Sequence, residues 1–122
     1  MSVAFNNNKA IYLQIANGIC DKILLKEYVG ESKIPSIRET AVNLEVNPNT
    51  VQRSYEWLQQ HDIIFTKRGL GYFTHTDAID KVVILRKKEF VTEVLPEVFK
   101  NMQLLNLSVD DLKTEYSNYL KK

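Results

Sequence analysis

Residues 34–53 read IPSIRETAVNLEVNPNTVQR, and this stretch decides the fold. Pro35 disfavours helical backbone at the residue before it, so a new element has to begin after the proline. Ser36 and Glu39 have the spacing of a capping box, in which each side chain bonds to the backbone amide of the other residue. The pattern therefore predicts a short helix over residues 37–44.

A tight turn over residues 45–47 follows, after which the sequence signals a second helix. Asn47 can cap this helix, and Pro48 can occupy its first position, where no amide donor is needed. Its apolar side chains share one face, and the polar side chains left on the other face are Asn49, Thr50, Gln52, Arg53 and Glu56. Two helices joined in this way are typical of a helix-turn-helix.

The flanking segments extend this arrangement on both sides. Before it, isoleucines recur every fourth residue over residues 9–26, which predicts a helix that an asparagine of residues 6–8 would cap. After it, residues 63–66 and 72–75 are rich in β-branched and aromatic residues, and the basic, glycine-containing residues 67–71 connect them as in a β-hairpin. This order of elements predicts a winged helix-turn-helix, whose third helix enters the major groove of DNA.

Residues 77–122 return to helical periodicity. An apolar stripe long enough for about 25 residues of helix contains Pro96, which is expected to kink the helix or split it. Ser108 and Asp111 then offer a capping signal for a final helix. We therefore expect a mainly α fold with a small β-hairpin, in which a winged helix-turn-helix domain over residues 1–76 precedes a two-helix dimerisation tail. The expected dimer contacts are apolar residues of the tail stripes: Val83, Phe90, Val94, Leu95, Val98, Phe99, Leu112 and Tyr116.

The composition excludes several classes of function. A chain of 122 residues and 14.2 kDa, with 44% hydrophobic and 25% charged residues, can fold one ordinary domain with an accessory segment but no large multi-domain enzyme. Its formal net charge is +1, so any affinity for nucleic acid must come from the local placement of charge. The sequence contains no glycine-rich phosphate loop and no nucleophile motif, so we expect neither enzymatic activity nor a cofactor.

Cysteine and histidine usage points the same way. The lone Cys20 excludes an internal disulfide and a zinc site built on several thiolates, and we expect it to be a buried apolar residue. His61 and His75 lack neighbouring cysteines or patterned carboxylates, so no metal site is expected. No stretch approaches the roughly 18 apolar residues that span a bilayer, and no secretory signal precedes the first helix. We expect a cytoplasmic protein.

Several motifs stand in a characteristic order along the chain: Tyr12-Leu13-Gln14-Ile15, Ile34-Pro35-Ser36-Ile37-Arg38-Glu39, Val46-Asn47-Pro48-Asn49-Thr50-Val51, residues 55–58, and Arg68-Gly69-Leu70-Gly71-Tyr72-Phe73. Together they resemble the GntR family of bacterial transcription regulators over about residues 11–74. The short helical tail resembles the YtrA subfamily, whose members carry a two-helix dimerisation segment. Many family members place a basic residue where this chain has Pro48, so the resemblance implies one contact to DNA fewer at that position.

The resemblance implies which residues contact double-stranded DNA. Arg38 would do so from the second helix, and Arg68 and Gly69 from the tip of the wing, where an arginine suits a narrow minor groove. The full set of expected DNA contacts is Ser36, Arg38, Asn47, Asn49, Thr50, Gln52, Arg53, Lys67, Arg68 and Gly69. A simpler interpretation stays open for the arginines: Arg38 could pair with Glu39 or Glu45, and Arg53 with Glu56 or Glu45.

We therefore expect a sequence-specific transcription regulator, in particular a repressor, that binds an inverted-repeat operator as a homodimer. Its two-fold symmetry would space the half-sites by about 10 bp, or by a related distance that the tails set. The alternative is a winged helix that binds another protein and no specific DNA. The tail is too short for a ligand domain of its own, so a small-molecule effector, if one acts, would bind at the dimer seam or between tail and wing.

Overall fold

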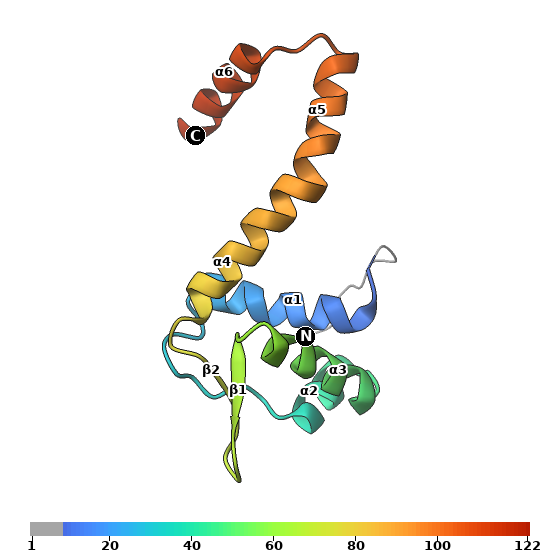
Figure 1. The fold of residues 1–122 in the computed structure, drawn as a ribbon, viewed down its shortest axis with the longest axis vertical. Coiled ribbons are helices and arrows are strands. Elements are labelled where there is room, and N and C mark those ends of the chain that lie inside the picture. The colour runs from blue at the N-terminus through green and yellow to red at the C-terminus, as the bar shows by residue number, and fades with distance from the viewer. Residues whose placement is uncertain (1–8) are drawn as a thin grey trace. The chain divides into compact units, whose positions relative to one another are not determined.

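The computed structural model describes residues 9–122 and confirms the expected fold class, mainly α with a small β-hairpin (Figure 1). The elements in chain order are α1 (Ile11–Leu24), α2 (Ile37–Leu44), α3 (Pro48–Gln60), β1 (Ile64–Lys67), β2 (Gly71–Thr74), α4 (Ala78–Glu89), the π-helical segment η1 (Phe90–Val94), α5 (Leu95–Leu104) and α6 (Val109–Leu120). Contacts divide the chain into two units, Met1–Leu85 and Arg86–Lys122. This division falls inside α4, whereas the sequence pattern placed a boundary after residue 76, because Ala78 and Val82 belong to the buried core of the first unit.

The two central helices begin where their capping signals predict. The Ser36 hydroxyl accepts a hydrogen bond from the Glu39 amide at 3.0 Å, and the Glu39 carboxylate accepts one from the Ser36 amide at 3.1 Å. The turn after α2 uses Glu45 in the left-handed region, with φ of 55°. The Asn47 side-chain oxygen then accepts a hydrogen bond from the Asn49 amide at 2.8 Å. Local side-chain chemistry thus sets both helix starts.

The start of α1 corrects one expectation. The helix begins at Ile11, and its N-cap is Ala10, whose side chain makes no capping hydrogen bond. The predicted asparagine cap is therefore wrong, because the helix starts two residues later than expected; residues 6–8 themselves lie outside the described residues. The isoleucine stripe is buried as predicted, and Cys20 is buried with it at 2% exposure.

The first unit closes its apolar core among three helices and the hairpin. α3 packs against both α1 and α2, and Val51 and Leu58 of α3 are completely buried. Ser54, also buried, donates a hydrogen bond to the Tyr12 carbonyl oxygen at 2.6 Å and so joins α3 to α1. Nearly all residues of the core are aliphatic, which favours tight burial.

The hairpin forms the wing. β1 and β2 pair antiparallel with Ile64 opposite Thr74 and Lys67 opposite Gly71, so the connecting loop is three residues long, shorter than the expected five. Gly69 and Gly71 have φ of 78° and 111°, values that favour glycine. A bridge between Lys33 and Phe73 adds the chain before α2 to the edge of this sheet.

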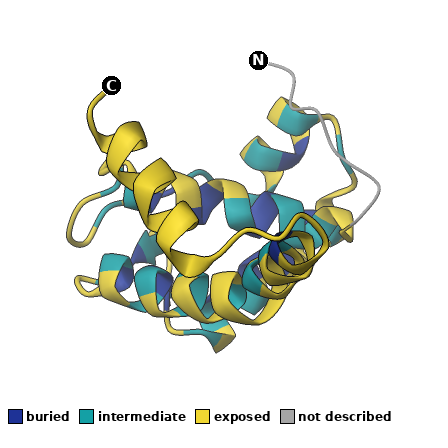
Figure 2. Ribbon diagram, turned by 90° about the horizontal axis from the view of Figure 1, so that it is seen from above, coloured by how far each residue is buried: buried dark blue, intermediate teal, exposed yellow. Residues whose placement is uncertain are grey.

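The second unit is helical except for the connection at residues 105–108, and it has almost no core. The chain stays helical through Pro96, which lies in the first turn of α5, because the preceding π-helical turn lets the Leu95 amide bond to the Phe90 carbonyl. The Ser108 and Asp111 side chains form the expected cap of α6. Met102 is the one buried residue of the unit, and all of α6 is exposed (Figure 2).

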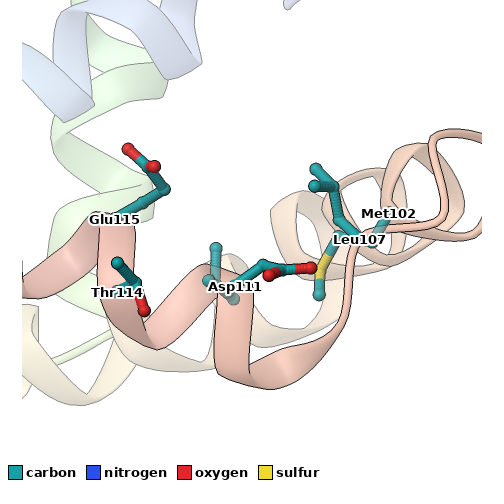
Figure 3. A pocket seen from close by; sticks show the side chains of 6 residues that line it. Met102, Leu107, Asp111, Thr114 and Glu115 are labelled. Atoms are coloured by element: carbon teal, nitrogen blue, oxygen red, sulfur yellow. The ribbon is translucent and has the colours of Figure 1, made fainter.

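A hollow of about 270 Å³ remains between α5 and α6 (Figure 3). Met102, Leu107 and Leu112 supply its apolar lining, and Asp111 and Glu115 its acidic lining. The two helices of this unit therefore do not fill the space between them with their own side chains. Among the helices of the described residues, none is long and apolar enough to cross a membrane.

Candidate nucleic-acid interface

The exposed face of α3 carries the polar residues that the sequence pattern placed there. Asn49, Gln52 and Arg53 are exposed and Thr50 is half-buried. The Gln52 amide donates a hydrogen bond to the Glu56 carboxylate at 3.3 Å, one helical turn further on. This exposed pair is weak and can exchange for another partner, because water competes for both groups.

Arg53 has a partner that the sequence analysis did not foresee. Its guanidinium carbon lies 4.0 Å from the centroid of the Tyr12 ring, a cation–π contact between α3 and the first turn of α1. The pairing considered from the sequence, with Glu56 or Glu45, is not the contact found. Tyr12 is half-buried and holds the guanidinium beside the first turn of α1.

A shallow hollow of about 380 Å³ lies between the first turns of α1 and α3. Its lining comprises one turn of each helix: Ala10, Ile11, Tyr12, Asn49, Thr50 and Arg53. Backbone amides of both helix starts gather on this side, and the positive ends of the two helix dipoles coincide with an arginine. The hollow thus has the charge that suits a phosphate group.

The remaining candidates on and beside α2 divide into two kinds. The side chains of Ser36 and Asn47 are engaged in helix caps, so their role in the free protein is structural. Arg38 is exposed, and within residues 9–122 its guanidinium has no hydrogen bond or ion pair, so the expected alternative of a pair with Glu39 or Glu45 is absent there. Arg38 therefore presents a free positive charge.

The two basic residues of the wing, Lys67 and Arg68, also differ in whether their side chains have a partner. Arg68 and Gly69 lie exposed at the tip, where the loop turns. Lys67, by contrast, forms an ion pair with Glu31, and its ammonium lies 4.6 Å from the centroid of the Phe73 ring. Glu31 carried no signal in the sequence, because the two residues meet only when the chain before α2 runs along the wing.

Tyr55, buried beneath this surface, contacts α2, the chain before it and the wing. Its hydroxyl donates a hydrogen bond to the Pro35 carbonyl at 2.7 Å and accepts one from the Thr40 hydroxyl at 2.9 Å. Its ring meets Tyr72 of the wing edge-on, with centroids 4.9 Å apart. Burial raises the pKa of Tyr55 to about 12, so the hydroxyl stays protonated at neutral pH. Tyr55 therefore fixes α2, α3 and the wing relative to one another.

The two histidines pack against aromatic rings. His61 lies with its ring centroid 4.2 Å from that of Trp57, and His75 lies 4.7 Å from Phe65. Over the described part of the chain, no group of three or more histidine, cysteine or acidic side chains could hold a metal ion. The chemistry that this surface offers is hydrogen bonding and positive charge.

An exposed recognition helix, a second helix with a free arginine and a basic wing define a winged helix-turn-helix, a class of DNA-binding fold. Comparison with known proteins places it further: the chain belongs to the gntR family of bacterial regulatory proteins, whose family model matches residues 11–73. Members of this family are DNA-binding transcription regulators and not enzymes, and this chain is one of them.

Individual relatives extend the match beyond the winged helix. The HTH-type transcriptional regulator YhcF of Bacillus subtilis is 38% identical over 92% of this chain and 91% of its own length. The HTH-type transcriptional repressor YtrA of the same organism is 28% identical over 82% of this chain and 74% of its own length. A crystal structure of a GntR-family regulator from Bacteroides thetaiotaomicron, 43% identical, superposes with a TM-score of 0.80 over 92% of this chain and 97% of that one.

Proposed function

We propose that this regulator is a repressor that binds an inverted-repeat operator as a homodimer, in the cytoplasm where the bacterial chromosome lies. The observation that carries the proposal is the set of exposed polar groups on three elements of one unit. The side chains of Arg38 on α2, Asn49 on α3 and Arg68 on the wing have no hydrogen-bond or ion-pair partner among residues 9–122. Free groups of this kind can bind DNA without first breaking a contact within the protein.

The proposed contacts differ in what they recognise. Asn49, Gln52 and Arg53 would read base edges in the major groove, because amide and guanidinium groups can make paired hydrogen bonds to adenine and guanine. Arg38 and Thr50 would bind the sugar-phosphate backbone of the DNA beside these bases. Arg68 and Gly69 would enter the minor groove next to this major groove. Lys67, at the end of β1, would lie close to them and add a positive charge. Ser36 and Asn47 would act chiefly as caps that direct backbone amides toward phosphates.

The homodimer rests on the apolar surface of the second unit. Among residues 9–122, twelve of the eighteen exposed large hydrophobic side chains lie after Arg86. They include expected dimer contacts such as Phe90 at 50%, Phe99 at 50% and Tyr116 at 62% exposure. Of the other expected contacts, Val83, Leu95 and Val98 are half-buried, and Val94 and Leu112 are exposed. Clustered apolar surface of this extent is typical of a protein interface, and a second copy would cover it.

Two further points support the role as a repressor. The relative YtrA is named a transcriptional repressor, and the alignment with it includes most of the tail as well as the winged helix. A protein that covers an operator next to a promoter blocks transcription without any further domain. We expect its operator upstream of its own gene, where such regulation is direct.

The proposal is tested by fluorescence-anisotropy titration against DNA from upstream of the gene and against a scrambled duplex. Tight binding that prefers the upstream duplex and weakens steeply between about 50 and 200 mM salt is expected, because bound arginines displace counterions. Equal and weak binding to both duplexes would overturn the proposal and favour a winged helix that binds protein.

Variants separate the proposed roles. Arg38→Ala and Arg68→Ala should each lower affinity and reduce the salt slope by about two, since a symmetric dimer loses two positive charges that displace counterions from DNA, at about 0.9 each. Gln52→Ala should mainly relax sequence preference. Lys121→Ala, at the exposed end of α6, serves as the control for loss of a positive charge and should change neither quantity.

A further inference from the structure

A second hollow lies on the first unit, away from the first turn of α3. It is enclosed by α1, α2 and the chain leading into α2, and its volume is about 190 Å³. Ile15, Ile19 and Leu44 are among its apolar lining residues, and the half-buried Tyr28 and the buried Tyr55 also line it. None of the DNA contacts proposed above belongs to its lining. The hollow therefore needs a separate explanation.

Gly18 keeps this hollow open. It lies in the middle of α1, where glycine weakens a helix relative to alanine, and it is not among the glycines with positive φ. A Cβ placed on Gly18 would meet no heavy atom within 4 Å beyond the backbone of its own helix. Neither backbone geometry nor packing within the chain explains the glycine. A ligand that approaches α1 closely at this point does.

The lining also sets the chemistry of that ligand. Lys22 is the one charged side chain among the described residues that line the hollow, and its ammonium lies 5.9 Å from the centroid of the Tyr28 ring. Asn43 adds an amide at the rim. One positive charge and amide donors around an apolar, aromatic space suit a flat apolar body with a single negative charge.

We propose that this hollow is a binding site for a one-ring aromatic carboxylate. The volume agrees, because an apolar cavity of about 150 Å³ in another protein accepts benzene. The ring would lie against the half-buried Tyr28 and the aliphatic side chains of the lining, and the carboxylate would point to Lys22. Gly18 would allow the ring edge to reach the backbone of α1.

A ligand at this place would contact the helix-turn-helix directly. Thr40 of α2 lines the hollow, and its hydroxyl donates the hydrogen bond that Tyr55 of α3 accepts. A bound ligand would therefore lie against the hydrogen bond between Thr40 and Tyr55 that holds α2 to α3. The site lies within the first unit and differs from the dimer seam and the tail–wing position expected for an effector from the sequence.

The test is a titration of the full-length, ¹⁵N-labelled protein with benzoate, followed by amide chemical shifts and carried out without DNA. Saturable shifts are expected at Gly18, Thr40 and Asn43, with a dissociation constant below about 10 mM. Benzamide, which lacks the charge, should bind about fivefold more weakly. No saturable shift, or shifts that centre elsewhere, would overturn the proposal whatever the protein does with DNA.

Variants place the ligand. Gly18→Leu fills the hollow from α1 and should abolish benzoate binding while the remaining spectrum keeps its dispersion. Lys22→Gln should reduce benzoate binding to the level of benzamide, whereas Lys26→Gln, an exposed lysine outside the hollow, should leave it unchanged. Benzoate binding that survives in both Gly18→Leu and Lys22→Gln contradicts the assigned site.

Discussion

The two units of this chain are built from similar helices but differ in how they bury them. In the first unit, Val51 and Leu58 are completely buried and the three helices share one core. In the second, Met102 alone is buried among residues 86–122, and Tyr116 stands 62% exposed. Both units nevertheless start a helix with the same capping box. Local signals thus decide where a helix begins. Tertiary packing decides whether the unit that contains the helix is stable without a partner.

The largest effect should come from the closed core. Leu58→Ala should reduce the free energy of unfolding by about 2–5 kcal/mol, because it removes buried methyl groups and leaves a cavity. Leu25→Ala changes a leucine of the same unit that is 73% exposed and should cost under about 0.5 kcal/mol. Urea denaturation followed by circular dichroism measures both. Equal losses would mean that the first unit is not closed as described.

The exposed tail should respond through association. Tyr116→Glu places a charge on the apolar face of α6, and we expect the dissociation constant of the dimer to rise by about 100-fold. Asn118→Glu adds the same charge two residues further on, about 200° around the helix, and should leave the dimer intact. Sedimentation equilibrium reports both values. A dimer that tolerates both substitutions would show that α6 lies outside the interface.

The Tyr55 hydroxyl should make an intermediate contribution to the free energy of unfolding of the first unit. Tyr55→Phe removes one hydroxyl and leaves the Pro35 carbonyl and the Thr40 hydroxyl without their partner, which should cost about 1–2 kcal/mol of unfolding free energy. Tyr119→Phe, an exposed tyrosine of α6, is the control and should cost nothing measurable. Chemical denaturation distinguishes the two.

The same tyrosine predicts a pH dependence. Its folded pKa of about 12 lies above the ordinary value of 10.0 because burial disfavours the phenolate. The stability that this difference supplies is complete below pH 10 and is lost as the pH rises from about 10 to about 12. Tyr55→Phe should therefore show a shallower fall in stability over that range. An unchanged profile would place the Tyr55 hydroxyl in water.

The smallest effects should come from the two capping boxes. Ser36→Ala should lower the unfolding free energy of the first unit by about 1 kcal/mol, and Ser108→Ala should instead fray the start of α6. Hydrogen bonds from Ser36 lower the pKa of Glu39, and those from Ser108 lower the pKa of Asp111. NMR titration of the carboxyl groups should show each pKa returning toward its ordinary value in the matching serine variant, and no change in the other.

Elements set by local chemistry could be predicted from the sequence. Ser36, Asn47 and Ser108 fixed their helix starts, because a cap involves residues only two or three positions apart. The first strand of the wing was expected one residue early and the second one residue late, since β-branched composition marks a strand but not its register. The π-helical turn before Pro96 gave no recognisable signal, and a kink or a split was expected in its place.

Contacts between distant parts of the chain could not be predicted. Tyr12 under Arg53 and Glu31 beside Lys67 depend on how α1 and the chain before α2 pack, which no local pattern encodes. Arg38 illustrates the reverse: its motif gave the position, and only the structure tells that no carboxylate within residues 9–122 pairs with it. The sequence therefore predicted which residues lie on the candidate surface better than how they are held there.

The central claim is that the first unit binds DNA and that two chains pair through the exposed apolar surface of the second unit. Native mass spectrometry of the protein bound to a duplex from upstream of its gene tests this claim most directly. We predict a complex that contains two chains of 14.2 kDa per duplex and, for Tyr116→Glu at the same concentration, free duplex with little complex. A complex with one chain per duplex, formed equally well by Tyr116→Glu, would contradict the claim.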